Sequence, residues 1–269
     1  MILQEYKNVD NIKIFHETID GHADYNVKGL ENLYKQEEKH FWFIARKEFI
    51  FNNIKKFIEK HEKIIEIGAG TGNVSRYLIE NEYKDISVGE MHLTGLKYAQ
   101  SYGIEKCYQF NLLDTPFENE FNAVCMFDVL EHIEDASAAL KNVNRMLQEN
   151  GKIVLTVPSH MWLWNRSDAI AGHKIRYTKK QLMQKLEEEG FEVLSARYFF
   201  ISIILLLILR RLLEKDNGRE VKNQEYDKDI SIISPLNHLL LWISRIENKL
   251  NRFLPNLCGG SLFIVGRKR

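Results

Sequence analysis

Ile64-Ile65-Glu66-Ile67-Gly68-Ala69-Gly70-Thr71-Gly72-Asn73 is the stretch of sequence that decides the fold. Its first part is a short apolar run, which predicts a buried strand, and helical spacing begins at Asn73. Three glycines at alternate positions let the backbone turn sharply, and they let a ligand approach where a Cβ would otherwise stand. Open N–H groups at the start of the helix would suit a polar or anionic ligand. The stretch therefore predicts a strand, a ligand-binding loop and a helix in succession.

Short apolar runs alternate with helical stretches on the C-terminal side of this loop. The predicted strands are Lys63–Ile67, Ile86–Gly89, Cys107–Phe110, Ala123–Phe127, Lys152–Val157 and Phe191–Ala196. The predicted helices are Asn73–Glu82, Leu93–Tyr102, Asp135–Gln148 and Thr178–Glu189. Alternation of this kind predicts βαβ units, and hence an α/β fold with a mostly parallel, doubly wound sheet. Such sheets bind ligands at the carboxyl ends of their strands.

The two ends of the chain do not follow this alternation. Before the first predicted strand, helical spacing occurs at Tyr25–Lys39 and Phe41–Lys60. Near the C-terminus, Tyr198–Leu209 is apolar but shorter than the ~20 residues of a membrane-spanning helix. The charged stretch Glu214–Asp229 predicts a loop, Pro235–Leu254 a further helix, and Ser261–Val265 a last strand. We therefore expect an N-terminal helical segment (1–60), a ligand-binding core (61–198), an apolar helical insertion (199–258) and a final core strand (259–269).

The composition excludes several classes of protein. The chain has 269 residues, of which 45% are hydrophobic, so it can bury a core without disulfide support. Its three cysteines are widely spaced, which disfavours a disulfide framework or a zinc cluster. Lysine and arginine number 37, as do aspartate and glutamate, so no bulk charge attracts nucleic acid. The polar stretch Met1–Lys7 is unlike a secretory signal, and we expect a cytoplasmic protein without a bound metal.

Two ligand classes compete for the glycine loop. A dinucleotide fingerprint, G-x-G-x-x-G, would place its third glycine at position 73, where the chain has Asn73. The observed order, an acidic residue followed by G-x-G-x-G, resembles class I S-adenosylmethionine-dependent methyltransferases. Phe127-Asp128-Val129-Leu130-Glu131-His132 resembles the D-V-L-E-H segment of the same family. The resemblance implies a Rossmann-like, seven-stranded, mostly parallel sheet whose final strand is antiparallel, and S-adenosyl-L-methionine as cofactor.

The resemblance also implies which residues bind the cofactor. Glu66 would hold its ammonium group, Glu90 its ribose hydroxyls, and Asn111 its adenine, with Asp114 as the substitute for Asn111. The expected cofactor-binding residues are Phe43, Arg46, Glu66, Gly68, Ala69, Gly70, Gly72, Glu90, Met91, Asn111, Leu112, Asp128 and Val129. The segment from Asp128 to His132 would line the crevice where the sulfonium methyl group is presented.

Two further stretches resemble a bacterial subgroup of these methyltransferases whose substrate is usually unassigned. They are His40-Phe41-Trp42-Phe43 with Arg46, and the segment from Val157 to Thr178, which contains Gly172-His173-Lys174-Ile175-Arg176-Tyr177. Aromatic side chains here can shield the sulfonium from water, and basic ones can hold an anionic part of the acceptor. The acceptor-binding candidates are His40, Trp42, Trp162, Trp164, Lys174, Arg176 and Tyr177. Simple packing of these aromatics and solvation of these basic residues are the alternatives, and Tyr177-Thr178 is also a helix cap.

The sequence thus predicts methyl transfer to a small-molecule or lipid-like acceptor, with the acceptor atom left open. His132 and His173 are the candidate catalytic bases, because imidazole accepts protons near neutral pH. A non-catalytic S-adenosylmethionine-binding or scaffold protein is the alternative, followed by a nicotinamide-dependent oxidoreductase. The apolar insertion (199–258) predicts a cover over the acceptor, a homodimer contact or a peripheral membrane contact.

Overall fold

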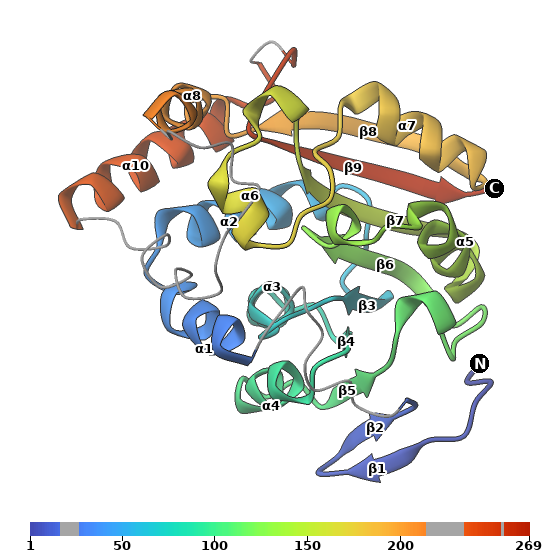
Figure 1. Cartoon of the computed structure of the whole chain (residues 1–269). Coiled ribbons are helices and arrows are strands. Elements are labelled where there is room, and N and C mark those ends of the chain that lie inside the picture. The colour runs from blue at the N-terminus through green and yellow to red at the C-terminus, as the bar shows by residue number, and fades with distance from the viewer. Residues whose placement is uncertain (17–26, 214–233, 254–255) are drawn as a thin grey trace.

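The computed structural model describes residues 1–16, 27–213, 234–253 and 256–269. These residues form one sheet with helices on both faces (Figure 1). The strands are β1 (Lys7–Val9), β2 (Ile12–Ile14), β3 (Lys63–Ile67), β4 (Asp85–Glu90), β5 (Lys106–Gln109), β6 (Phe121–Phe127), β7 (Leu147–Pro158), β8 (Phe191–Phe199) and β9 (Ser261–Lys268). The α-helices are α1 (Val27–Gln36), α2 (Phe41–Ile54), α3 (Asn73–Glu80), α4 (Leu93–Ser101), α5 (Ala136–Met146), α6 (Arg166–Ile170), α7 (Lys179–Glu188), α8 (Ile204–Leu213) and α10 (Ser234–Leu250).

The sheet has the order β1-β2-β5-β4-β3-β6-β7-β9-β8. Strands β5, β4, β3, β6 and β7 run parallel, and β9 is antiparallel to both of its neighbours, β7 and β8. The strand order reverses at β3. Strands β4 and β5, which follow β3 in the chain, lie on one side of it, whereas β6, the next strand in the chain, lies on the other side. This reversal brings the ends of β3, β4 and β6 together, which is where a doubly wound sheet forms its ligand crevice. The predicted fold class and antiparallel final strand are confirmed.

The predicted count of seven strands was wrong, because the sheet has nine within the described residues. The two additional strands, β1 and β2, form a hairpin whose turn residues Asp10 and Asn11 have φ of 52° and 62°. Positive φ at both central residues is the requirement of a type I′ hairpin turn. Strand β2 pairs in parallel with β5, and Ile12 is buried against Val88 and Cys107. Residues 1–60 are therefore not a purely helical segment.

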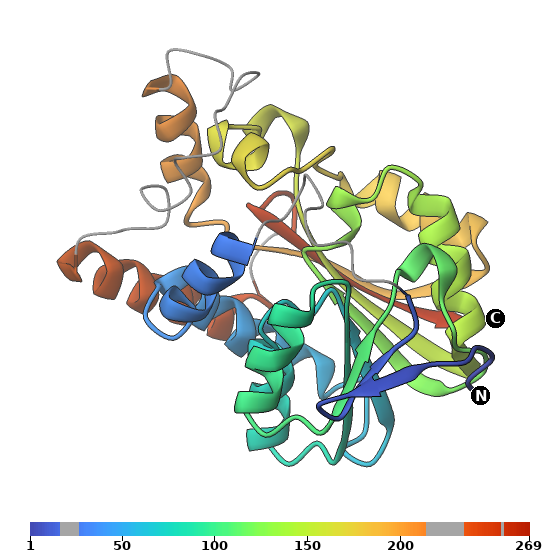
Figure 2. The ribbon, with the colours of Figure 1, turned by 60° about the horizontal axis from the view of Figure 1, so that its bottom comes forward.

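Successive residues of the central strands pack on opposite faces of the sheet. Ile65 and Val124 belong to a core that α5 and α7 cover, whereas Ile64 and Ala123 belong to a core that α2 and α3 cover. Figure 2 shows these layers from another side. A parallel strand with helices on both faces must be apolar on both sides, which explains the nearly continuous apolar runs of the sequence.

The segment between β8 and β9 contains α8 and α10, of which α10 packs beside α2 (Figure 1). The expected apolar helix begins at Ile204 rather than Tyr198, because β8 continues to Phe199. Glu247 of α10 accepts hydrogen bonds from the backbone N–H groups of Ile201 and Ser202, at 2.7 and 2.8 Å, and so anchors the start of α8. The predicted charged loop, Glu214–Asp229, lies outside the described residues. Of the helices in the described ranges, none is long and apolar enough to span a membrane.

Candidate active site

The glycine loop joins β3 to α3 at the point where the strand order reverses. Gly68, Gly70 and Gly72 all have positive φ, of 63°, 56° and 80°. A Cβ at Gly68 would stand 2.6 Å from the Val129 side chain, so glycine is required for close packing as well as for conformation. Gly72 begins α3 and packs against α4, where a Cβ would meet Ala99 at 2.9 Å.

The N–H groups of this loop are not open donors, contrary to the expectation from sequence. Those of Gly68 and Ala69 bond to the Gly89 carbonyl, and that of Gly72 bonds to the Ala69 carbonyl. The N–H of Gly70 donates to Glu90 Oε2 at 3.0 Å. A pyrophosphate would need such donors to be available. The loop therefore disfavours the dinucleotide alternative and leaves carboxylates as the polar groups of this part of the site.

Two buried carboxylates stand at the loop. Glu66 is 4% exposed, and its Oε2 accepts a hydrogen bond from the Ser75 N–H at 2.9 Å. Burial raises the pKa of Glu66 to about 7, although Ser75 and Arg46 act in the opposite direction. Glu37, at the end of α1, accepts from the Thr71 and Tyr102 hydroxyls, and burial raises its pKa to about 6. An ammonium group bound here would offset the cost of burying these negative charges.

The ends of β4 and β5 provide the next groups along the same wall. Glu90 Oε1 accepts from the N–H groups of Met91 and His92, at 2.7 and 3.1 Å, which fixes the carboxylate at the cavity. Asn111 lines the cavity, and its side-chain oxygen caps the short helix η1 (Leu112–Asp114) through the Leu113 N–H. Asp114 does not line the cavity, because it pairs with His16 at the surface. The substitute adenine contact was therefore wrong.

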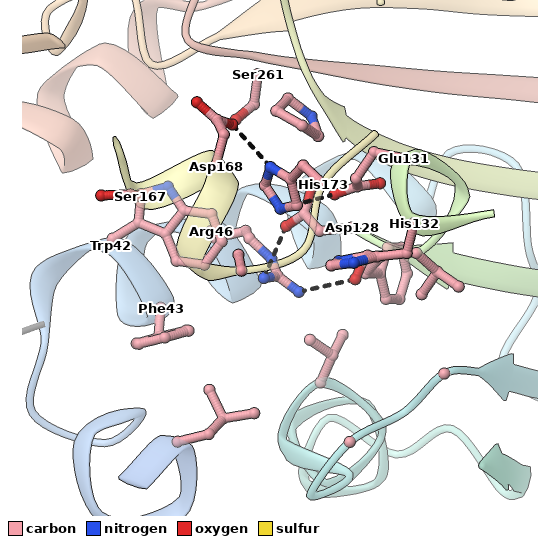
Figure 3. Close-up of a pocket in the computed structure, with 18 of the residues that line it drawn as sticks. Trp42, Phe43, Arg46, Asp128, Glu131, His132, Ser167, Asp168, His173 and Ser261 are labelled. Atoms are coloured by element: carbon pink, nitrogen blue, oxygen red, sulfur yellow. Dashed lines mark hydrogen bonds and ion pairs between the residues drawn. The ribbon is translucent and has the colours of Figure 1, made fainter. Parts of the chain in front are cut away.

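The turn after β6 is held by an arginine from α2. Asp128 has φ of 58°, and its Oδ2 lies 2.8 Å from Nη1 of Arg46 (Figure 3). The guanidinium of Arg46 also stacks on Trp42, with 4.7 Å between the guanidinium carbon and the ring centroid. Thr156 of β7 donates to Asp128 Oδ1 at 3.1 Å. The sequence analysis treated the segment that contains Arg46 and the segment that contains Asp128 separately. The two segments meet at this ion pair, which joins α2 to the turn after β6.

Next to this ion pair lies a group of three side chains, Glu131, His132 and His173. The imidazoles of His132 and His173 pack edge to face, with 4.8 Å between their ring centroids. His173 Nε2 lies 3.8 Å from Glu131 Oε1, and its Nδ1 lies 2.7 Å from Asp168 Oδ1. Glu131 is fully buried, and burial raises its pKa well above the usual value, with Asp128 adding to the effect. The two histidines predicted as catalytic are therefore brought together at one place.

A single cavity of about 1440 Å³ contains all these groups. Its polar side is formed by the glycine loop, Glu66, Glu90 and the Glu131–His132–His173 group. Its opposite side is apolar and comes from the segment between β8 and β9, with the lining residues Phe200, Ile203, Leu206, Leu207, Leu209, Leu236 and Leu240. Part of the apolar insertion is thus a wall of the cavity.

Most of the predicted site residues line this cavity. These are His40, Trp42, Phe43, Arg46, Glu66, Gly68, Ala69, Gly70, Glu90, Met91, Asn111, Leu112, Asp128, Val129, His132, His173, Lys174 and Arg176. Among them, Arg176 is 6% exposed, and its guanidinium donates to Asp168 Oδ1 at 2.8 Å and to the Ser159 carbonyl. The alternative of a solvated side chain is therefore wrong for Arg176, whose guanidinium is held by Asp168 and Ser159.

Four predicted residues do not line the cavity: Gly72, Trp162, Trp164 and Tyr177. Gly72 shapes the loop from behind. Trp162 is 47% exposed, and its ring lies 5.6 Å from that of His160 between centroids, outside the cavity. Tyr177 is buried in the core beside Thr178, whose side chain caps α7 in a capping box with Gln181, as the alternative reading predicted.

Sequence reasoning missed Glu37 and Asp168 as parts of the site. Glu37 lies at the end of an amphipathic helix and belongs to no motif. Asp168 is 1% exposed and joins His173 to Arg176, and it also accepts from the Asn165 N–H in the capping box of α6. Asp168 had two sequence signals, its place in the Val157–Thr178 segment and its spacing from Asn165, but the second indicates a helix start and neither gave Asp168 a role.

Comparison with known proteins agrees with this fold. The model of a methyltransferase domain family matches residues 41–196. A methyltransferase from Thermotoga maritima has a similar structure, with TM-score 0.55 and 16% identity over 90% of this chain and 99% of that chain. One from Mesorhizobium loti has TM-score 0.54 and 13% identity over 82% and 98%. Phosphoethanolamine N-methyltransferase 2 of Haemonchus contortus, solved with S-adenosyl-L-methionine, has TM-score 0.54 and 12% identity over 89% and 60%. No curated protein matches the sequence.

Proposed function

The chain belongs to the methyltransferase domain family, and from this premise we propose that it transfers a methyl group from S-adenosyl-L-methionine to a small-molecule or lipid-like acceptor. The observation that carries the proposal is the single cavity that joins the glycine-loop carboxylates to the Glu131–His132–His173 group. One end of this cavity suits the cofactor, and the other offers polar groups to an acceptor.

The residues present fit the cofactor. Glu66 and Glu37 are buried carboxylates whose charge an ammonium group would balance, and Glu90 presents oxygen acceptors for ribose hydroxyls. Gly68 and Gly70 leave space where side chains would stand, while Asn111 and Leu112 would contact the adenine. The cofactor supplies an electrophilic methyl group, and the protein supplies orientation and exclusion of water.

Methyl transfer is a displacement at carbon. An electron pair of the acceptor forms the new bond to the methyl carbon, and the carbon–sulfur bond breaks with its pair left on sulfur, giving S-adenosylhomocysteine. A protonated acceptor must also lose a proton. The Glu131–His132–His173 group is placed to promote this, either by taking the proton on an imidazole or by lowering the pKa of the acceptor. Arg46 and Asp128 would hold the turn that carries this group.

We also propose that the acceptor has an apolar part. The wall formed by Phe200, Ile203, Leu207 and Leu240 is apolar, whereas the charged and imidazole side chains come from other parts of the lining. An acceptor with a polar end and an apolar body would satisfy both walls, since buried apolar surface contributes roughly 25 cal/mol per Å².

A panel of acceptors with radiolabelled methyl donor tests the proposed activity. Lysate extracts divided into lipid, sugar and small-molecule fractions would be incubated with the protein, and we expect label in an organic-soluble product. The double variant His132→Ala/His173→Ala should lose turnover at saturating acceptor, whereas His61→Ala, an exposed histidine, should not. A protein that binds the cofactor and its product yet labels no fraction would be the non-catalytic binder instead.

Helices α8 and α10, and the turn that follows α10, also expose apolar side chains to the outside. Leu205 and Leu212 are each 77% exposed, Trp242 is 62% exposed and Phe253 is 71% exposed. Because the same helices wall the acceptor half of the cavity, we propose that this face rests on a lipid surface from which the acceptor is taken.

Co-sedimentation with vesicles tests the lipid surface. The intact chain should sediment with phospholipid vesicles, and Trp242→Ser/Phe253→Ser should weaken this at least tenfold. Ile79→Ser, on α3, is the matched control for an exposed apolar residue elsewhere. Absence of the intact chain from the vesicle pellet, or a stable dimer that buries these residues, would rule out the lipid contact.

A further inference from the structure

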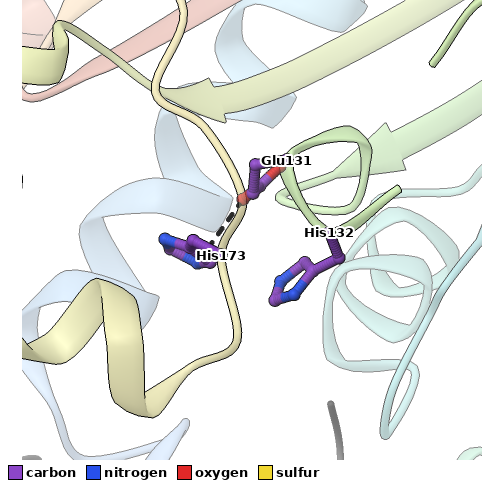
Figure 4. A group of neighbouring side chains, drawn as sticks. All are labelled: Glu131, His132 and His173. Atoms are coloured by element: carbon purple, nitrogen blue, oxygen red, sulfur yellow. Dashed lines mark ion pairs between the residues drawn. The ribbon is translucent and has the colours of Figure 1, made fainter. Parts of the chain in front are cut away.

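The Glu131–His132–His173 group has the composition of a metal site. One ligand atom of each residue can be chosen so that all lie within 4.8 Å of one another (Figure 4). Two imidazole nitrogens and one carboxylate oxygen form the donor set of several catalytic zinc sites. The three side chains come from two segments, the turn after β6 and the loop after α6, which the backbone N–H of Lys174 ties together by donating to the Glu131 carbonyl at 2.8 Å.

Glu131 is the observation that requires an explanation. Its side chain is 0% exposed, and neither carboxylate oxygen accepts a hydrogen bond from another described residue. A buried carboxylate without such partners is costly unless a cation or a proton neutralises it. His173 is the nearest cation candidate, but its Nε2 at 3.8 Å from Glu131 Oε1 is too far for a hydrogen bond. No hydrogen-bond donor of the described residues therefore satisfies Glu131 at the position between its Oε1 and His173 Nε2.

His173 is oriented to present a lone pair at this position. Its Nδ1 lies 2.7 Å from Asp168 Oδ1, and Asp168 is itself held by Nε of Arg176 at 2.8 Å. A carboxylate at Nδ1 accepts the proton of that nitrogen, which leaves Nε2 as the acceptor that faces Glu131 (Figure 3). A carboxylate behind a histidine is the usual support of a metal-binding imidazole. Asp168 and Arg176 thereby have a role in orienting the His173 imidazole, which cofactor binding alone does not require.

The distances are close to those of a coordinated ion. Two ligands that bind one tetrahedral ion at ~2.1 Å lie roughly 3.4 Å apart. The Glu131–His173 pair is thus within a few tenths of an ångström of that separation. The ligand atoms of the three residues lie within 4.8 Å of one another, so His132 must approach by up to about 1.4 Å through rotation of its side chain.

From these contacts we infer that Glu131, His132 and His173 bind a divalent transition-metal ion, with Zn²⁺ as the first candidate, at the acceptor end of the cavity. Three protein ligands leave one coordination position open toward the cavity. An acceptor oxygen in that position would lose its proton to water more readily, because a bound divalent ion lowers the pKa of a ligating hydroxyl. The inference rests on the proposed function and narrows the acceptor class to compounds with a hydroxyl or enol oxygen.

As ligands, the two imidazoles use the lone pairs that a general base would need. The metal ion then replaces base catalysis as the means of activating the acceptor. The displacement itself is unchanged: the oxygen forms the bond to the methyl carbon, the carbon–sulfur bond breaks, and the proton has already passed to water. The expectation of a metal-free site, drawn from cysteine spacing, did not consider histidine and glutamate ligands.

Direct metal binding tests the inference independently of turnover. The full chain would be stripped with a chelator, dialysed against Zn²⁺ or Co²⁺, and its metal content measured by mass spectrometry. We expect about one ion per chain, and visible absorption bands of tetrahedral intensity for Co²⁺. Glu131→Gln, His132→Ala and His173→Ala should each weaken binding at least 100-fold. Asp168→Asn should weaken it about 10- to 100-fold, the effect typical of losing a support for a ligand. His61→Ala should bind as the unchanged chain does.

Calorimetry with S-adenosylmethionine on the same samples separates the two proposals. Cofactor binding without any metal binding would overturn the metal site and leave the methyltransferase assignment standing. Metal binding that survives all three ligand substitutions would also overturn it, since the ion would then lie elsewhere. The Co²⁺ spectrum of the unchanged chain reports the ligand set even if a variant fails to fold. A chain that binds metal at these ligands but no cofactor would support the site and contradict the proposed function.

Discussion

The carboxylate of Glu66 belongs to the glycine-loop motif of the sequence and is the group proposed to bind the ammonium of the cofactor. It stands in an otherwise apolar strand, and its burial at 4% exposure raises its pKa to about 7. In the unfolded chain the same group titrates near 4.5. A carboxyl group whose folded pKa is raised contributes stability below pH 4.5, and this contribution is lost as the pH rises through 7. A cationic ligand beside it would favour the ionised form and reverse that loss.

The affinity for S-adenosylmethionine should therefore depend on pH. Below pH 7, binding must ionise Glu66 and release a proton, so affinity should rise between pH 5.5 and 7 by up to about tenfold per unit. Calorimetry in two buffers with different ionisation heats measures both the affinity and the proton released. Glu66→Gln should abolish the rise of cofactor affinity with pH above pH 6. Glu37→Gln should retain this rise, because the pKa of Glu37 is about 6. A flat affinity profile in the unchanged chain would contradict the role given to Glu66.

Gly68 permits a second test at the scale of one residue. Gly68→Ala places a residue at φ of 63° and a Cβ 2.6 Å from Val129, so both strain and a clash are expected. Gly103→Ala is the matched control, since its φ is 83° but nothing lies within 4 Å of the added Cβ. The strain alone costs about 1–3 kcal/mol. Urea unfolding should show a larger loss for Gly68→Ala, together with weaker cofactor binding. Equal losses in the two variants would show that the close packing at Gly68 is unimportant.

At this scale the sequence predicted some residues of the site and missed others for a physical reason. Glu66 and Glu90 lie in the last residues of β3 and β4, and Asp128 directly follows β6, so the topology alone carries them to one edge of the sheet. Glu37 reaches the site through a contact with Thr71, 34 residues away in the chain, which no local pattern encodes. Asp168 contacts His173 only five residues away, but the turn that ends α6 lies between them, so neither helical nor strand spacing predicts the contact.

Among the secondary-structure elements, β3 to β6 were predicted with errors of at most two residues at their ends, because buried parallel strands are apolar throughout. The start of β7 was wrong, since the strand begins at Leu147 and takes the last two residues of the predicted helix Asp135–Gln148. The β1–β2 hairpin was missed because each strand has only three residues, and the side chains of β1 are exposed. Such short strands carry no clear alternation, and their pairing with β5 is a tertiary contact. The turn Asp10-Asn11 was the one available signal.

Helices α8 and α10 depend on each other through Glu247. Its two oxygens accept from Ile201 and Ser202 at the start of α8, and it is 6% exposed. Glu247→Ala should cost about 1–3 kcal/mol of stability, because it removes the charged acceptor of these part-buried hydrogen bonds. Glu188→Ala, at an exposed position of α7, should change stability by about 0.5 kcal/mol or less. Urea unfolding measures the change in the free energy of unfolding for each variant. Hydrogen exchange should locate the loss of stability at residues 201–207. Unchanged exchange there would contradict the coupling.

The whole molecule is organised around a cavity with two unlike walls. One wall belongs to the sheet and was predictable from motifs, because the carboxyl ends of β3, β4 and β6 must meet there. The other wall comes from a segment placed between β8 and β9, and its position against α2 depends on contacts such as Arg245 with Glu48. The sequence left this segment open between a cover, a dimer contact and a membrane contact. Its lining residues make it at least a cover.

The charge balance of 37 against 37 also has a different meaning at this scale. Several charged groups are buried at the cavity rather than spread over the surface, among them Glu37, Glu66, Glu131, Asp168 and Arg176. The acidic members outnumber the basic one, so the cavity favours cationic ligands. A sulfonium cofactor with an ammonium group, and a divalent ion beside it, both suit this excess of negative charge.

Calorimetric titration with S-adenosylmethionine, S-adenosylhomocysteine and NAD tests the central claim most directly. We predict that the full chain binds both sulfur compounds at one site per molecule and shows no heat with NAD. Gly68→Ala should lose both interactions, while the control Gly103→Ala should retain them. Binding of NAD with neither sulfur compound bound would contradict the assignment and restore the nicotinamide alternative.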